Sequence, residues 1–173
     1  MGDGRKKLKK AGLKSDREDA LRDPDWALGR LSPDGARRAT LFTDGGARGN
    51  PGPAAYGLVI YDSEGNELLR RAVRIGRATN NVAEYSAVIA GLDLARQLGI
   101  TGLDVYLDAQ LVVRQLTGEY RTKDPRLAEL KTRTLALARE LTRVRFHFIP
   151  REKNRLADSL VSAALDGRDP DTL

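Results

Sequence analysis

The chain has 173 residues, no cysteine, one histidine and a formal net charge of +6, and 40% of its residues are hydrophobic. This composition fits one compact domain with some excess length, and the lack of cysteine excludes disulfides and thiolate chemistry. No apolar run reaches membrane-spanning length and no signal peptide is recognisable, so we expect a soluble cytoplasmic protein without a membrane partner.

The positive charge is concentrated at the N-terminus. Residues 1–14 contain six basic side chains and one acidic side chain, a net charge of +5, so the other 159 residues are almost neutral. We predict a basic, partly disordered extension over residues 1–38, with one or two short helical turns, which adds electrostatic affinity for nucleic acid. Two alternatives stay open: an inert solubilising tail, and packing of Trp26 on the domain.

The compact domain is predicted to span residues 39–166, followed by a polar tail at 167–173. It begins with three strand-like runs, at 39–43, 54–61 and 68–75, and turn residues join the last two as a hairpin. Hydrophobic periodicity then predicts a helix, a strand, two helices, a strand and a helix. Their ranges are 81–98, 103–107, 109–116, 125–141, 144–149 and 154–165.

This order of elements predicts an α/β domain in which a helical crossover places the fourth strand parallel to the first. If these two strands are neighbours, the direction of the connections reverses between them, where open α/β sheets bind ligands. Asp44 follows the first strand and Asp108 follows the fourth. Both carboxylates would then project into one crevice.

Two further acids, Glu84 and Asp158, lie beside the apolar stripes of predicted helices. Taken singly, three of the acids have structural interpretations: Glu84 in a capping box with Asn81, Asp108 as a helix cap, and Asp158 as an acid in a first helical turn. Four carboxylates around one crevice would repel one another. Oxygen ligands suit Mg²⁺ or Mn²⁺, and two such ions about 4 Å apart can clamp an in-line phosphoryl displacement.

The residues after Asp44 are rich in glycine. We expect Gly45 and Gly46 to let a substrate backbone approach the acid, because they have no side chains. The spacing does not fit a dinucleotide fingerprint, and a P-loop lysine is absent. The segment from Gly49 to Pro53 is also typical of a rigid turn.

Four segments, in order, resemble the type 1 ribonuclease H family: TDGGARGNPGPAAYG, ATNNVAEYSAVIAGL, VYLDAQLVVRQL and PREKNRLADSL. The resemblance covers about residues 40–164 and implies a five-stranded mixed sheet of order 3-2-1-4-5 flanked by helices. It implies Mg²⁺-dependent hydrolysis of the RNA strand of an RNA–DNA hybrid, leaving 5′-phosphate and 3′-hydroxyl ends. We expect a monomer with two ions per site, for which Mn²⁺ can substitute.

The resemblance also implies roles for individual residues. Asp44 would bridge both ions, Glu84 and Asp108 would hold the ion beside the leaving oxygen, and Asp158 would hold the ion that activates water. Gly45, Asn80 and Gln110 match positions that contact the RNA strand, where 2′-hydroxyl groups identify RNA. Further substrate contacts are assigned to a DNA-phosphate pair, Asn50 and Thr79, and to Gly46, Asn81, Tyr120, Lys123 and Asn154.

The sequence departs from the family pattern in two places. The loop before the last helix lacks the histidine of many members, and the only histidine, His147, is expected to be structural within a strand. The basic handle is replaced by GEYRTKDPRL, as in a short, archaeal-like subgroup. In this segment Tyr120, Arg121 and Lys123 either line the DNA strand or form an ordinary charged loop. A nuclease that also cuts double-stranded RNA, and a non-catalytic hybrid-binding module, stay open as alternatives.

Overall fold

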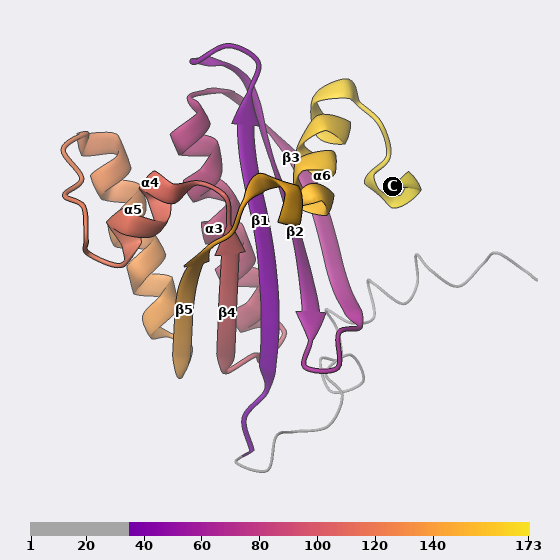
Figure 1. The fold of residues 1–173 in the computed structure, drawn as a ribbon, viewed down its shortest axis with the longest axis vertical. Coiled ribbons are helices and arrows are strands. Elements are labelled where there is room, and N and C mark those ends of the chain that lie inside the picture. The colour runs from indigo at the N-terminus through magenta and orange to yellow at the C-terminus, as the bar shows by residue number, and fades with distance from the viewer. Residues whose placement is uncertain (1–34) are drawn as a thin grey trace, which may run out of the picture.

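The computed structural model describes residues 35–173, so the predictions for residues 1–34 of the N-terminal extension, including Trp26, lie outside the described residues. The described part forms a five-stranded sheet of order β3-β2-β1-β4-β5, which confirms the predicted order (Figure 1). The strands are β1 (Arg38–Ala47), β2 (Gly52–Asp62), β3 (Glu67–Ala78), β4 (Gly102–Leu107) and β5 (Arg143–Phe148). β1 pairs antiparallel with β2 and parallel with β4.

Four helices flank this sheet: α3 (Asn80–Gln97), α4 (Gln110–Leu116), α5 (Pro125–Arg139) and α6 (Arg155–Asp166). The helices α3, α4 and α5 share the main core on one face, and α6 lies on the other face, mainly over β2 and also in contact with β1 and β3 (Figure 1). Two short 3-10 turns, η1 (Arg151–Lys153) and η2 (Pro170–Thr172), precede and follow α6. None of the helices in residues 35–173 is long and apolar enough to cross a membrane.

The main core lies between the sheet and α3. Leu41 of β1, Leu58 of β2, and Val88 and Leu92 of α3 are fully buried there. Because alternate strand residues point to opposite faces, Leu41, Thr43 and Gly45 face α3, whereas Asp44 faces the α6 side. The alternation of side chains along β1 therefore places the carboxylate of Asp44 on the face of the sheet that carries α6, which is the less covered face.

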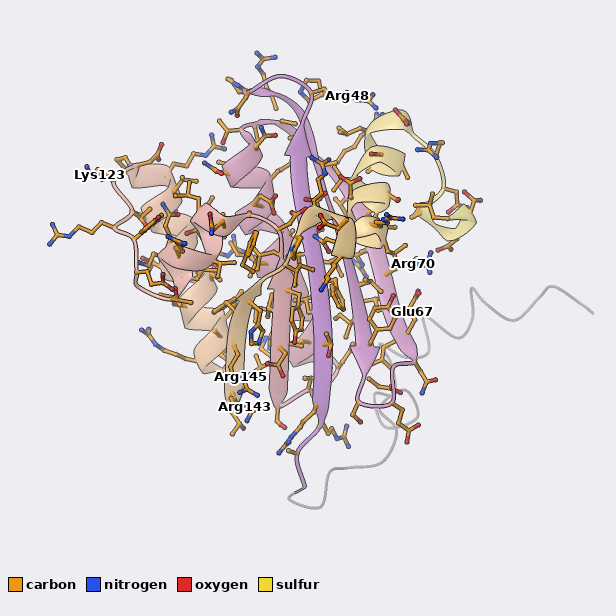
Figure 2. All side chains as sticks on the ribbon, viewed as in Figure 1. Arg48, Glu67, Arg70, Lys123, Arg143 and Arg145 are labelled. Carbon is orange, nitrogen blue, oxygen red and sulfur yellow. The ribbon has the colours of Figure 1, made fainter. Side chains whose placement is uncertain are left out.

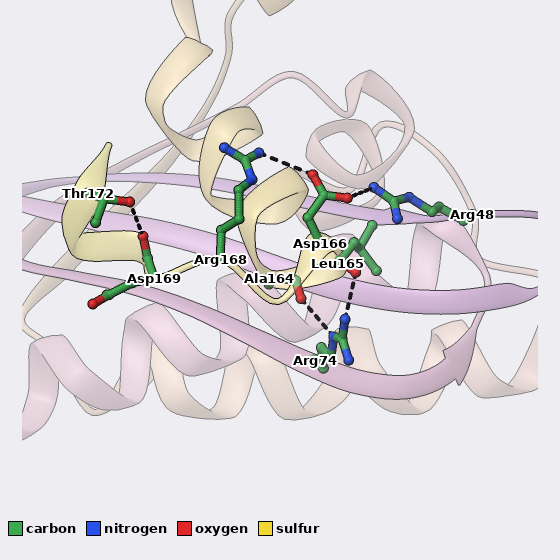
Figure 3. A network of polar contacts seen from close by, with 8 residues as sticks. All are labelled: Arg48, Arg74, Ala164, Leu165, Asp166, Arg168, Asp169 and Thr172. Atoms are coloured by element: carbon green, nitrogen blue, oxygen red, sulfur yellow. Dashed lines mark hydrogen bonds and ion pairs between the residues drawn. The ribbon is translucent and has the colours of Figure 1, made fainter.

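The C-terminal residues pack against β3. Gly167 ends α6 in the left-handed conformation that glycine tolerates best, with φ of +68°. Arg74 of β3 donates hydrogen bonds to the carbonyl oxygens of Ala164 and Leu165 (Figure 3). The backbone carbonyl of Leu173 accepts a hydrogen bond from Arg70. The predicted boundary of a separate tail at residue 167 stays a prediction.

Candidate active site

The crevice begins where β1 and β4 stop pairing. Their parallel register ends at Thr43 and Leu107, and Asp44 and Asp108 are the next residues of the two strands. The prediction that the first strand ends at residue 43 is wrong, because β1 continues to Ala47 through its antiparallel pairing with β2. Asp44 consequently sits on a strand held from one side, and its backbone is fixed by that pairing.

Gly45 brings α3 close to this fork. A Cβ atom added at Gly45 would lie 2.2 Å from the carbonyl carbon of Ala83 and 2.3 Å from the backbone nitrogen of Glu84. The missing side chain therefore makes room for the helix backbone, and the expectation that Gly45 also lets a substrate backbone approach Asp44 stays a prediction. A Cβ at Gly46 would lie 3.4 Å from Cγ1 of Val161 in α6. The glycines after Asp44 let two helices approach β1 and bring their acids with them.

Three carboxylates converge at this place. One oxygen each of Asp44, Glu84 and Asp108 lies within 4.8 Å of the others, and Asp44 and Glu84 are both 8% exposed. Burial, followed by the charges of Asp108 and Asp158, raises the pKa of Asp44 to about 7. Burial, followed by the charges of Asp44 and Asp108, raises the pKa of Glu84 well above its usual value. Burial also raises the pKa of Asp108.

These residues fit a hard divalent cation. The ligand atoms are all carboxylate oxygens, which Mg²⁺ and Mn²⁺ prefer. Oε2 of Glu84 is buried and has no hydrogen-bond partner among the described residues, a costly state for a charged oxygen. A cation in the cluster would satisfy this oxygen and offset both the burial and the repulsion that raise the three pKa values.

The single-residue interpretations of two acids are wrong. The N-cap of α3 is Thr79, whose Oγ1 accepts a hydrogen bond from the backbone of Val82 at 3.3 Å, so Glu84 does not belong to a capping box with Asn81. The N-cap position of α4 is Ala109, without a side-chain cap, so Asp108 does not cap that helix. Neither carboxylate caps a helix, and both line the crevice.

Asp158 lies in the first turn of α6, as predicted, and lines the same crevice of about 510 Å³. Among the described residues it does not belong to the tight group of three acids. Its Oδ1 accepts a hydrogen bond from Nη2 of Arg151 at 2.6 Å. The sequence pattern assigns no role to Arg151, because it does not show that the 3-10 turn η1 places this side chain next to Asp158.

The predicted substrate residues divide into two groups. Gly45, Gly46 and Asn80 line the crevice together with the four acids. Asn80 also joins two segments, since its Oδ1 accepts from the backbone of Ala47 at 2.9 Å and its backbone donates to Oδ1 of Asn50 at 3.1 Å. The remaining predicted residues do not line the crevice: Asn50, Thr79, Asn81, Gln110, Tyr120, Lys123 and Asn154. Their contacts with substrate stay predictions.

Two of these predicted residues are engaged elsewhere. Asn154 is 2% exposed, and its Nδ2 donates to the carbonyl oxygen of Thr43 at 2.8 Å, which ties the start of α6 to β1. Tyr120 is 44% exposed, and the guanidinium carbon of Arg114 lies 5.1 Å from its ring centroid. Figure 2 shows Lys123 on the loop before α5, at the opposite side of the view from Arg48.

His147 lies in β5, outside the crevice, as its predicted structural role requires. Its Nε2 is 2.8 Å from Oδ1 of Asp104, and its ring stacks on Tyr106 with centroids 4.7 Å apart. The loop between β5 and α6 has no histidine, unlike the loop in many members of the family that the sequence resembles. Instead it contributes Arg151 to the crevice.

Comparisons with known proteins agree with this geometry. Residues 42–164 match the family model described as reverse transcriptase-like. A bifunctional protein of Mycobacterium tuberculosis is 44% identical over 130 residues, which cover 75% of this chain and 36% of that protein. Ribonuclease HI of Halobacterium salinarum is 40% identical over 136 residues, which cover 79% of this chain and 68% of that enzyme. The chain thus spans about a third of the length of the mycobacterial relatives that it matches.

Solved structures give the same result. The N-terminal ribonuclease H domain of the mycobacterial protein superposes with a TM-score of 0.73 at 44% identity, covering 75% of this chain and 94% of that one. Ribonuclease H1 of Halobacterium salinarum gives 0.74 at 41% identity, with coverages of 75% and 98%. LC11-RNase H1 in complex with an RNA/DNA hybrid gives 0.71 at 42% identity, with coverages of 75% and 97%. The matched fold, the order of its strands and the extent of the sequence match together show that the chain belongs to the ribonuclease H family.

Proposed function

We propose that this chain is a metal-dependent endoribonuclease that hydrolyses the RNA strand of RNA–DNA hybrids and leaves 5′-phosphate and 3′-hydroxyl ends. The observation that carries the proposal is the convergence of Asp44, Glu84 and Asp108 within 4.8 Å at the end of two parallel strands. The choice of substrate is supported by LC11-RNase H1, a structural neighbour whose structure contains an RNA/DNA hybrid.

The acids divide the crevice into two sides that share Asp44. Glu84 and Asp108 form one side with it, and Asp158 lies on the other, close enough for its charge to raise the pKa of Asp44. We infer that each side holds one Mg²⁺ or Mn²⁺ ion. Bound there, the ions would neutralise charge that develops on the scissile phosphate and lower the pKa of the attacking water.

The protein itself would orient the substrate. The N-terminus of α3 at Asn80 lines the crevice, where the positive end of the helix dipole attracts an anion. The hydrogen bonds from Ala47 to Asn80 and from Asn80 to Asn50 hold the β1–β2 loop against this helix end. We infer that this rigid corner positions the duplex, with the RNA strand recognised through its 2′-hydroxyl groups.

One copy of the chain is sufficient for this site, since all four acids come from a single chain. We therefore infer a monomeric enzyme. The lack of cysteine suits a reducing compartment such as the cytoplasm.

Matched duplexes test the proposal. Labelled RNA–DNA, RNA–RNA and DNA–DNA duplexes of one sequence are incubated with Mg²⁺, with Mn²⁺ or with a chelator, and the product ends are identified by phosphatase and ligase treatment. The proposal requires cleavage of the RNA strand of the hybrid, dependent on the metal. Equal cleavage of the RNA–RNA duplex would support the broader nuclease, and tight hybrid binding without cleavage in either metal would support a binding module.

A further inference from the structure

A second hollow opens beside the acid crevice, on the α6 side of the sheet. We call it the arginine pocket, and its volume is about 500 Å³. Arg48 and Leu165 line both the arginine pocket and the acid crevice. The other residues that line the pocket are Pro53, Ala54, Arg74, Gly76 and Arg77.

Arg74 is held rigidly at this pocket. Its Nε donates to the carbonyl oxygen of Ala164 at 2.7 Å, and its Nη2 donates to that of Leu165 at 2.6 Å (Figure 3). These carbonyls belong to the last turn of α6, where helical N–H donors run out, and that of Ala164 also accepts a hydrogen bond from the backbone of Gly167 at 3.2 Å. Within residues 35–173 Nη1 of Arg74 donates no hydrogen bond. The side chain is therefore fixed in place with donor capacity to spare.

Arg48 lies on the boundary between the two hollows. Its Nη2 donates to Oδ1 of Asp166, and Oδ2 of the same carboxylate accepts from Arg168 at 3.2 Å (Figure 3). Within the described part of the chain, Arg77 donates only to the carbonyl oxygen of Pro51, at 3.4 Å. Three guanidinium groups, those of Arg48, Arg74 and Arg77, thus line the pocket. Among the described residues the one carboxylate that bonds any of them is that of Asp166, which Arg48 shares with Arg168.

This imbalance separates the pocket from an ordinary surface ion-pair network, in which charges of both signs alternate. Guanidinium groups bind phosphate through paired N–H donors. The pocket also has an apolar part formed by Pro53, Ala54 and Leu165, which suits a sugar or a base. Its volume lies in the range of sites for ligands of nucleotide size.

We propose that the arginine pocket binds a phosphate of the strand whose scissile phosphate lies in the acid crevice, at a neighbouring nucleotide. The inference rests on the proposed function and adds a second anchoring point to it. A polyanionic strand is repelled by four carboxylates at the crevice, and an adjacent cationic pocket offsets that repulsion. The shared residues Arg48 and Leu165 make the passage between the two hollows continuous.

The test uses the full chain carrying Asp44→Asn, so that binding is measured without cleavage. Fluorescence anisotropy with a labelled hybrid is recorded between about 50 and 200 mM salt for this protein and with Arg48→Gln or Arg168→Gln added. Arg168 is the matched control, because it shares the Asp166 carboxylate but does not line the pocket. Arg48→Gln should flatten the log–log salt slope by about 0.7–0.9, the value of one phosphate contact, and Arg168→Gln should leave it unchanged. Equal slopes for the two variants would overturn the proposal.

A second arm identifies the strand. The hybrid contains one short ribonucleotide block that fixes the cleavage position, and either strand is shortened one nucleotide at a time from each end. Removing one particular nucleotide from the cut strand should lower the affinity about five-fold or more. The same removal should have no effect in Arg48→Gln, because the lost phosphate acts through Arg48. If the affinity fell only when the DNA strand was shortened, the proposal would be contradicted. It would also be contradicted if the pocket bound adenosine monophosphate or inorganic phosphate while shortening either strand left the affinity unchanged.

The two proposals fail separately. If the unmodified chain cuts no duplex but the salt slopes and the truncation step behave as stated, the proposed function is wrong, and the arginine pocket stands as a phosphate site for the strand that contains the ribonucleotides. If the chain cuts the hybrid and Arg48→Gln matches its control, the pocket is wrong and the function stands.

Discussion

Nη2 of Arg151 lies 2.6 Å from Oδ1 of Asp158, so the fourth acid of the crevice forms an ion pair with a guanidinium group of the same chain. The charge of Arg151 also lowers the pKa values of Asp44 and Asp108, against the larger effect of burial. The Arg151 side chain is 78% exposed, so the ion pair is weak and readily exchanged. A divalent ion that binds Asp158 has to displace this guanidinium.

Arg151→Ala should therefore tighten binding of Mn²⁺ to the crevice and lower the melting temperature of the metal-free protein by a few degrees at most. Isothermal titration with Mn²⁺ and thermal denaturation in chelator measure the two effects. Arg155→Ala is the control, because Arg155 begins the same helix and has no ion pair in the described part of the chain. Unchanged Mn²⁺ affinity in Arg151→Ala would show that the two cations do not compete.

Metal-free stability should depend on pH through the buried acids. The pKa of Asp44 is raised from 3.8 to about 7, so the folded state binds this proton more tightly than the unfolded chain. The resulting stabilisation is complete below about pH 4 and is lost as the pH rises through 7. Melting temperatures in chelator should fall over this range for the parent, and fall less for Asp44→Asn.

At about pH 8 Asp44→Asn should be the more stable protein, by up to about 4 kcal/mol, because the rise from 3.8 to about 7 is roughly three pKa units and each unit corresponds to about 1.4 kcal/mol. Saturating Mg²⁺ should abolish the pH dependence of the parent, since the cation replaces the proton. If the melting temperatures of the parent and of Asp44→Asn depended on pH in the same way, the pKa of Asp44 would not be raised in the folded protein.

Gly45 and Gly46 offer a matched pair of substitutions. Gly45→Ala would place a Cβ 2.2 Å from backbone carbon of α3, so the helix must move, whereas the nearest atom to a Cβ at Gly46 is a side-chain carbon at 3.4 Å. Gly45→Ala should cost about 2 kcal/mol or more of stability, and Gly46→Ala should cost much less. Urea denaturation compares the two, and equal losses would contradict the close approach of α3.

His147→Gln should lower stability by about 1 kcal/mol, because it removes the hydrogen bond to Asp104 and the stacking on Tyr106. Turnover on the hybrid should be unchanged, since His147 lies outside the crevice. A large fall in turnover at an unchanged melting temperature would give His147 a catalytic role.

The positions of the acids could be predicted from sequence because each depends on a local pattern: an apolar run before Asp44 and before Asp108, and a helical stripe around Glu84. The strand order came from the resemblance of four segments to a known family, since local patterns left the neighbour of the fourth strand open. The roles of the glycines could not be predicted. Gly45 is surrounded by α3, and only the packed structure shows that the space beside it is filled by Ala83.

The arginines were missed for a related reason. Arg48, Arg74 and Arg151 lie in three segments far apart in the sequence, and each looks like an ordinary surface cation there. Their roles follow from the end of α6 packing on β3 and from the 3-10 turn that places Arg151 over Asp158. Long-range packing of this kind leaves no periodic signal in the sequence.

The most direct measurement of the central claim is the cleavage rate of an RNA–DNA hybrid by the parent, by Asp44→Asn and by Asp104→Asn, each at saturating Mg²⁺. Asp44 belongs to the buried acid group, whereas Asp104 is an acid of the same sheet that binds Arg145 and His147 outside the crevice. The acid crevice, as the site of hydrolysis, predicts loss of at least about a thousand-fold in rate for Asp44→Asn, an effect typical of losing a central catalytic group, and a rate near that of the parent for Asp104→Asn. A folded Asp44→Asn protein that still cuts the hybrid at the parental rate would contradict it.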